Sequence, residues 1–163
     1  PSLVPMDSPL AQLDGGTNMV VIEGDAIGQL VMRGAGAGEG PTASAVMGDV
    51  MDIARGLLIP VFGQPAKSLR NATAVQTERE TAFYIRLSLR DQPGVLSRVS
   101  AELANAGISI DRMRQQSHDE TDAAPVLIVT HATKPATVAL ALKAIAKTGL
   151  TMATPVAMRI EAV

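Results

Sequence analysis

The chain has 163 residues, of which 47% are hydrophobic and 2% aromatic, and its formal net charge is −2. A slightly acidic chain with so few aromatic side chains lacks the basic patch and the stacking surface that nucleic-acid binding normally requires. The absence of cysteine excludes a disulfide framework, a thiolate zinc site and a cysteine nucleophile. No apolar run approaches the roughly 20 residues that span a bilayer, and we find no signal peptide, so we expect a cytoplasmic protein with no membrane partner.

The first residues read Pro-Ser-Leu-Val-Pro, with no initiator methionine, so we expect the chain to be a piece of a longer protein. Two short apolar stretches rich in Val and Ile follow at residues 18–23 and 26–32, with Gly24 and Asp25 between them. Short β-branched stretches on either side of a glycine-containing turn predict a β-hairpin or two adjacent strands.

A glycine-rich stretch, GAGAGEG at residues 34–40, comes next, and we expect it to be flexible. Pro41 suits the first turn of a helix, and Gly56 is a plausible end for it. After Pro41 the apolar residues recur at helical spacing and form one stripe, which comprises Val46, Val50, Ile53, Ala54 and Leu57.

This glycine stretch fits no standard nucleotide-binding template. The dinucleotide fingerprint needs glycine at its first, third and sixth places, but the sixth residue is Glu39 counted from Gly34 and Pro41 counted from Gly36. The phosphate-binding loop fails as well, because no Gly-Lys-Ser/Thr follows. Taken by itself, the stretch is therefore best interpreted as a glycine-rich turn before a helix.

Residues 58–81 show no sustained period and contain Pro60 and Pro65, which predicts a linker. The remainder, 82–163, is much more regular. It begins with a half-buried strand in which four apolar residues alternate with polar ones, namely Phe83, Ile85, Leu87 and Leu89.

A helical stripe ended by Gly107 follows this strand, then strands at 108–113 and 125–131, a second helix ended by Gly149, and a strand at 156–160. The order is β-α-β-β-α-β. With right-handed crossovers it predicts an α+β, ferredoxin-like fold, a four-stranded antiparallel sheet with both helices on one face.

The first strand of this pattern leads into its helix through Asp91-Gln92-Pro93-Gly94. A helix N-terminus presents unpaired N–H groups to a carboxylate, and Gly94 lets a ligand approach the backbone closely. The Asp91 carboxylate is suited to an ammonium group, so an amino acid would be matched at both ends. The alternative is that Asp91 merely caps the helix and that Pro-Gly only makes a turn.

A strand ending in Asp-Gln-Pro-Gly-Val-Leu, followed by a helix that closes on Asn-Ala-Gly-Ile-Ser-Ile, resembles the ACT domain, a small regulatory module that binds amino acids. In that family the effector lies between this turn and a neighbouring domain's sheet, usually in a dimer. The resemblance therefore implies a homodimer with these effector-binding residues: Asp91, Gln92, Gly94, Val95, Leu96, Ile108, Ser109 and Ile110.

The chain also resembles homoserine dehydrogenase. The segment GAGAGEGPTASAVMGDVMDIA and the residues before it resemble the C-terminal part of that enzyme's catalytic region. The linker PVFGQPAKSL resembles the joint that follows this region in bacterial members with an ACT tail. This resemblance implies three parts. Residues 1–57 form a strand-strand-helix remnant of the catalytic region, 58–81 a linker and 82–163 an ACT regulatory domain.

Homoserine dehydrogenase interconverts aspartate semialdehyde and homoserine with NAD(P), a step in threonine and methionine synthesis. The resemblance implies that the glycine stretch lines the cofactor cleft, with Gly36 foremost and with Ala37, Gly38 and Thr42. It also implies that threonine is the effector. The Rossmann domain and the catalytic lysines of the family are absent from this sequence, so we expect no catalytic residue, no bound cofactor and no activity in this chain alone.

Other candidate residues carry little chemistry. We expect the four lysines to be solvated charges: Lys67, Lys134, Lys143 and Lys147. His118 and His131 lack a metal-ligand spacing, and the carboxylates of residues 119–122 lie in a polar loop, so we expect no metal site. The alternative function for the whole chain is a non-catalytic ACT module that senses an amino acid or serves only to dimerise.

Overall fold

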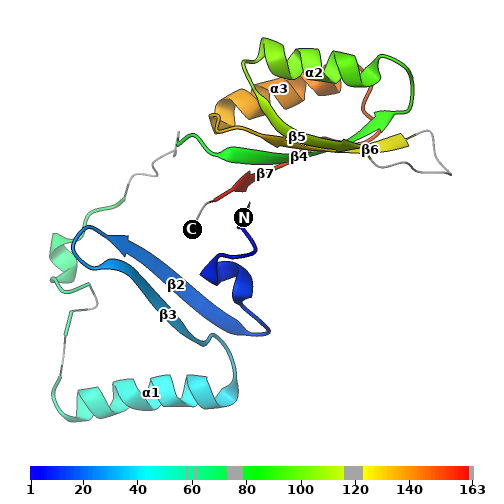
Figure 1. The fold of residues 1–163 in the computed structure, drawn as a ribbon. Coiled ribbons are helices and arrows are strands. Elements are labelled where there is room, and N and C mark those ends of the chain that lie inside the picture. The colour runs from blue at the N-terminus through cyan, green and yellow to red at the C-terminus, as the bar shows by residue number, and fades with distance from the viewer. Residues whose placement is uncertain (58, 61, 73–78, 116–122, 162–163) are drawn as a thin grey trace. The chain divides into compact units, whose positions relative to one another are not determined.

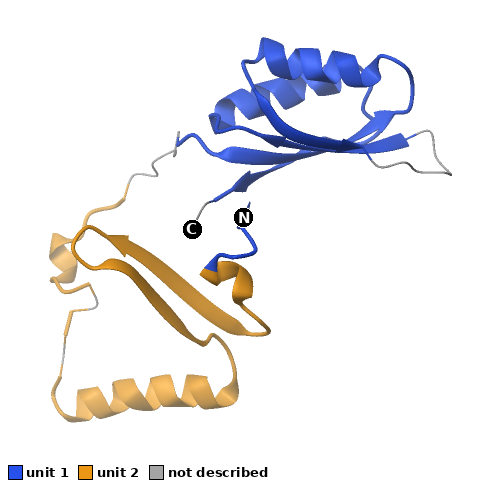
Figure 2. Ribbon diagram, viewed as in Figure 1, with its two compact units in different colours: residues 1–8, 76–163 blue, residues 9–75 orange. Residues whose placement is uncertain are grey.

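The computed structural model describes the chain except residues 58, 61, 73–78, 116–122 and 162–163 (Figure 1). The chain divides into two compact units, one of residues 1–8 and 76–163 and the other of residues 9–75 (Figure 2). Each unit is described by itself. The first eight residues group with the C-terminal unit and not with the hairpin that follows them in sequence.

The first unit is built on a mixed sheet whose strands lie in the order β1-β7-β4-β6-β5. Its elements are β1 (Ser2–Leu3), β4 (Ala82–Arg90), α2 (Val95–Asn105), β5 (Ile110–Gln115), β6 (Ala123–Thr130), α3 (Pro135–Lys147) and β7 (Val156–Ile160). Both helices lie on one face of the sheet (Figure 1). The prediction of an α+β, ferredoxin-like β-α-β-β-α-β fold is confirmed.

The alternation of apolar and polar residues explains how this sheet forms a core. On β4, the side chains of Phe83, Ile85, Leu87 and Leu89 point toward the helices and are buried. These side chains pack against the apolar stripes of α2 and α3 and against alternate residues of β6. One cluster of buried residues thus joins both helices to the sheet. Its other buried members are Val95, Val99, Leu103, Ile108, Val126, Ile128, Val138, Ala141 and Ile145.

A fifth strand was not predicted. β1 pairs in parallel with β7, with Ser2 opposite Arg159 and Leu3 opposite Ile160, and the Glu161 N–H donates to the Leu3 carbonyl at 2.9 Å. The predicted four-stranded antiparallel sheet is thus one strand too small. A strand of two residues has no periodicity to recognise, and its partner lies more than 150 residues away in sequence.

Two strand boundaries differ from the sequence prediction. The strand predicted at 108–113 runs from Ile110 to Gln115, because Ile108 is taken into the core beneath α2, where its N–H donates to the Leu103 carbonyl at 2.9 Å. The strand predicted at 125–131 is Ala123–Thr130.

The second unit consists of η1 (Pro9–Gln12), β2 (Thr17–Gly24), β3 (Gly28–Ala35), α1 (Glu39–Ala54) and η2 (Ala66–Ser68). The predicted hairpin is present, but its turn is made by residues 25–27, so residues 26 and 27 are not in a strand. The glycine stretch is also less flexible than expected. Gly34 is paired within β3 and Gly40 lies in α1, which leaves residues 36–38 as the connection.

None of the residues of α1 is buried, and its apolar stripe is exposed, with Ile53 at 64%. The hairpin likewise exposes Val20, Ile22 and Met32. The hairpin and the helix are nevertheless regular. The reason is that local hydrogen bonds define both elements, while the apolar surface that a core would cover remains open.

Candidate functional site

The connection between β3 and α1 holds the residues predicted to line a cofactor cleft. Gly36 continues the hairpin ladder by one bond, since its N–H donates to the Gly16 carbonyl at 3.1 Å. Gly38 is the N-cap of α1 with φ 126°, a backbone conformation that favours glycine. Thr42 lies in the first turn of the helix, where its N–H donates to the Gly38 carbonyl. Gly36, Gly38 and Thr42 therefore lie close together in sequence, where β3 leads into α1.

The N-terminus of α1 lacks a side-chain cap, because its N-cap residue is a glycine. Backbone N–H groups of the first turn are therefore not satisfied by the N-cap side chain, as they would be with Ser, Thr, Asp or Asn at residue 38. The arrangement provides backbone donors beside an open turn, which suits a negatively charged group of a ligand.

A side chain that we did not single out from the sequence lies against this turn. An ideal Cβ built on Gly36 would overlap the side-chain amide of Asn18. Asn18 stands opposite Gly34 in the hairpin register. Only that register reveals the contact, and the register depends on the length of the turn at residues 25–27.

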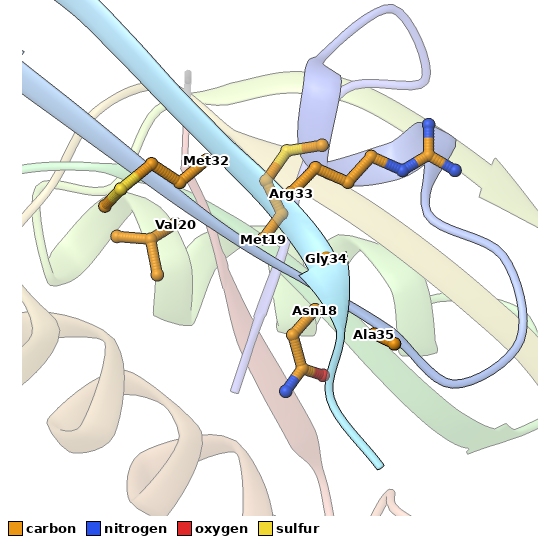
Figure 3. Close-up of a pocket in the computed structure, with 7 residues that line it drawn as sticks. All are labelled: Asn18, Met19, Val20, Met32, Arg33, Gly34 and Ala35. Carbon is orange, nitrogen blue, oxygen red and sulfur yellow. The ribbon is translucent and has the colours of Figure 1, made fainter. Parts of the chain in front are cut away.

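Asn18 also borders a shallow hollow of about 310 Å3 on the hairpin (Figure 3). The hollow is lined by Asn18, Met19, Val20, Met32, Arg33, Gly34 and Ala35. In Figure 3, Val20 and Met32 lie side by side, whereas no side chain faces Asn18 from Gly34.

The Asp-Gln-Pro-Gly turn lies between β4 and α2 in the other unit. Asp91, Gln92 and Gly94 are exposed, and Gly94 is the N-cap of α2 with φ 85°. The N-cap residue is a glycine, so no N-cap side chain pairs with the first N–H groups of α2. The Asp91 carboxylate and the N-terminus of α2, with its unpaired backbone N–H groups, therefore lie within a few residues of one another.

The structure does not bring the eight predicted effector residues together in one chain. Val95 and Ile108 are core residues, and Leu96 and Ile110 are half-buried against the core. Ser109 is exposed, with its carbonyl accepting the His131 N–H at 2.9 Å. The side chains that remain accessible to a ligand are those of Asp91, Gln92 and Ser109.

These accessible groups lie at opposite ends of the sheet. Arg90, just before the turn, is opposite Ala123 at one end of β6, and Ile110, just after Ser109, is opposite Thr130 at the other end. The length of β6 between these positions is about 24 Å at the usual rise of a strand. In one copy of this unit, the accessible residues predicted to bind the effector therefore lie in two separate places.

Residues 1–51 match the sequence model of the family described as homoserine dehydrogenase, and residues 83–149 match that of the ACT domain. A homoserine dehydrogenase from Mycobacterium leprae is 35% identical over 169 residues, covering 100% of this chain and 38% of the relative. The chain belongs to the homoserine dehydrogenase family. It corresponds to the C-terminal portion that ends in an ACT domain, as the resemblance implied.

Other members of the homoserine dehydrogenase family are similar to this chain to a similar degree. The Pseudomonas aeruginosa enzyme is 35% identical over 139 residues, covering 80% of this chain and 32% of the relative. The chain thus spans about a third of the length of the relatives it matches. The crystal structure of a homoserine dehydrogenase from Thiobacillus denitrificans aligns with a TM-score of 0.80 at 32% identity, covering 99% of this chain and 38% of that chain.

Among the remaining candidate residues, all four lysines are exposed. The described residues contain no group of three or more His, Asp or Glu placed to hold a metal ion. His118 and the carboxylates of residues 119–122 lie outside the described residues. Within the same described part, no helix is long and apolar enough to cross a membrane.

Proposed function

We propose that this chain is the C-terminal part of a cytoplasmic homoserine dehydrogenase that interconverts aspartate semialdehyde and homoserine with NAD(P), in threonine and methionine synthesis. The support is the similarity to homoserine dehydrogenases along the whole chain, which spans about a third of their length. This chain alone is expected to be inactive, since it carries no residue that matches a catalytic lysine of the family.

The connection between β3 and α1 forms part of the cofactor cleft in this proposal. The nicotinamide cofactor supplies or accepts the hydride when bound. Gly36, Ala37, Gly38 and Thr42 contribute backbone groups, and the uncapped start of α1 supports a role in facing the charged part of a dinucleotide.

The ACT domain binds an amino-acid effector, threonine, at the Asp91 turn. One observation carries this proposal: the N-terminus of α2 has no side-chain cap, while the Asp91 carboxylate beside it is exposed. The helix N-terminus matches the carboxylate of the effector, and Asp91 matches its ammonium group.

A homodimer completes the effector site. The Asp91 turn and Ser109 lie at opposite ends of one sheet, so two copies side by side with opposed strand directions bring the turn of one to Ser109 of the other. Each effector then contacts both copies. Threonine shifts the population of catalytic arrangements to the extent that it binds one arrangement more tightly than another.

Calorimetric titration of the chain with threonine tests the effector proposal, with isoleucine, methionine, serine and lysine as controls. We expect selective threonine binding at about one or one-half per chain, and a loss of affinity of at least ~10-fold in Asp91→Ala, since hydrogen bonds to charged groups contribute about 1.5–3 kcal/mol. Asp25→Ala, which removes an exposed carboxylate from the hairpin turn, should bind as the unmodified chain does.

Ser109→Ala should weaken threonine binding as well, and sedimentation of the chain should show a dimer. If no amino acid binds while the chain still dimerises, the ACT domain serves only for dimerisation and the effector proposal is wrong. The catalytic proposal is tested separately, by following NADPH oxidation with aspartate semialdehyde in a protein of the relatives' full length.

A further inference from the structure

Asn18 lies on the hairpin opposite a residue that has no side chain. Its partner across the ladder is Gly34, and Gly36 is the next residue on the same face of that strand's continuation. The side chain of Asn18 is therefore not held by a cross-strand neighbour. Figure 3 shows its amide beside the chain where it leaves β3.

The space beside Gly36 is filled by this amide. A Cβ at residue 36 would overlap the Nδ2, Cγ and Oδ1 atoms of Asn18. The neighbouring glycines differ, since a Cβ at Gly34 or Gly40 would meet nothing within 4 Å and one at Gly38 would come no closer than 3.4 Å to the Pro41 side chain. Gly36 is thus singled out among these glycines by a contact with a particular side chain.

The backbone of residue 36 therefore has neighbours on two sides. On one side its N–H donates to the Gly16 carbonyl at 3.1 Å, and on the other its Cα lies against the Asn18 amide. Two residues later the chain must reach φ 126° at Gly38 and begin α1. A fixed residue 36 limits the positions from which that helix can start.

We propose that Asn18 is a positioning residue for the cofactor turn, and that residue 36 is glycine in order to admit the Asn18 amide. The inference rests on the proposed function in one respect, namely that the turn at residues 36–38 borders the cofactor cleft. The side of residue 36 where a side chain would stand is occupied by Asn18 and is not available to a ligand. Asn18 acts on the cofactor through the backbone of the turn.

A double-mutant cycle on Asn18 and Gly36, in a protein of the relatives' full length, tests this inference without any cofactor. Hydrogen exchange of the peptide at residues 33–42 should become about five-fold faster in Asn18→Ala, because the side chain that lies against residue 36 is lost. Gly36→Ala should have a similar effect, because the new methyl group displaces the exposed and flexible amide. The double variant should exchange no faster than either single one.

Two further variants act as controls for this exchange measurement. Val20→Ala changes the next residue on the same face of β2 and should leave the exchange of residues 33–42 unchanged. Asn18→Asp keeps the size and shape of the side chain and should retain slow exchange. Additive effects of Asn18→Ala and Gly36→Ala, or no effect of Asn18→Ala, would overturn the inference.

Titration of NADPH, followed by its fluorescence, is the second readout. Asn18→Ala should raise the dissociation constant and the KM for NADPH about five-fold while changing kcat less than two-fold, because the residue positions the turn and does not touch the reacting atoms. If the unmodified protein binds no NADPH or NADH, the proposed function fails, while the exchange cycle still decides whether Asn18 positions the turn. If the double-mutant cycle shows the expected coupling but Asn18→Ala leaves the affinity for NADPH unchanged, the proposed effect of Asn18 on cofactor binding is wrong.

Discussion

Replacing Leu103 by alanine is expected to lower the free energy of unfolding of the ACT unit by about 3 kcal/mol. Leu103 lies on α2 with 0% of its surface exposed, within the cluster that joins both helices to the sheet. The shortened side chain leaves a cavity, because the surrounding sheet and helices relax only in part. Urea unfolding followed by the fluorescence of the single tyrosine, Tyr84 on β4, measures the change.

Leu140→Ala is the matched control for this substitution. Leu140 lies on α3 and is 67% exposed, so the same chemical change should alter the free energy of unfolding by less than about 0.5 kcal/mol. Equal losses of stability in the two variants would show that Leu103 does not occupy the core described above.

The second large effect is expected at a buried hydrogen bond. Thr130 is 1% exposed, and its Oγ1 accepts the backbone N–H of Phe83 at 3.0 Å. Thr130→Val keeps the shape of the side chain but removes the acceptor, which leaves a buried N–H group unsatisfied. The free energy of unfolding should therefore fall by about 2 kcal/mol, measured by the same urea titration.

Thr81→Val should act in the opposite direction. Thr81 is 7% exposed, and its Oγ1 is buried with no hydrogen-bond partner in the part of the chain that the structure describes. Replacing an unsatisfied hydroxyl by a methyl group should leave stability unchanged or raise it by up to about 1 kcal/mol. A loss in Thr81→Val as large as that in Thr130→Val would contradict the assignment of the hydrogen bond to Thr130.

The ACT fold could be predicted closely because its signals are local. The alternation from Phe83 to Leu89 and the helical stripe containing Val99 and Leu103 repeat with the periods of a strand and a helix. Each residue is buried or exposed as its period requires. Boundaries were less accurate, as at Ile108, which packs under α2 before the next strand begins.

The candidate sites could be predicted only in part. The turn at Asp91 and the connection at residues 36–38 were found because Pro and Gly mark them in the sequence. The contact of Asn18 with Gly36 was missed, since it depends on the register of the hairpin, which a single residue of turn length decides. The separation of Ser109 from the Asp91 turn was not predicted either, because both belong to one continuous motif in sequence.

The sequence by itself determined the order of strands and helices in the ACT domain, the apolar faces of β4 and of the two helices, and the two turns where ligands are proposed to bind. Short-range periodicity and turn chemistry suffice for these features. Only the tertiary structure decided that Ser2 and Leu3 join the ACT sheet beside β7, that Asn18 fills the space at Gly36, and that the residues predicted to bind the effector lie at opposite ends of the sheet. These features are contacts between distant segments, and they depend on pairing partners and register that no local pattern specifies.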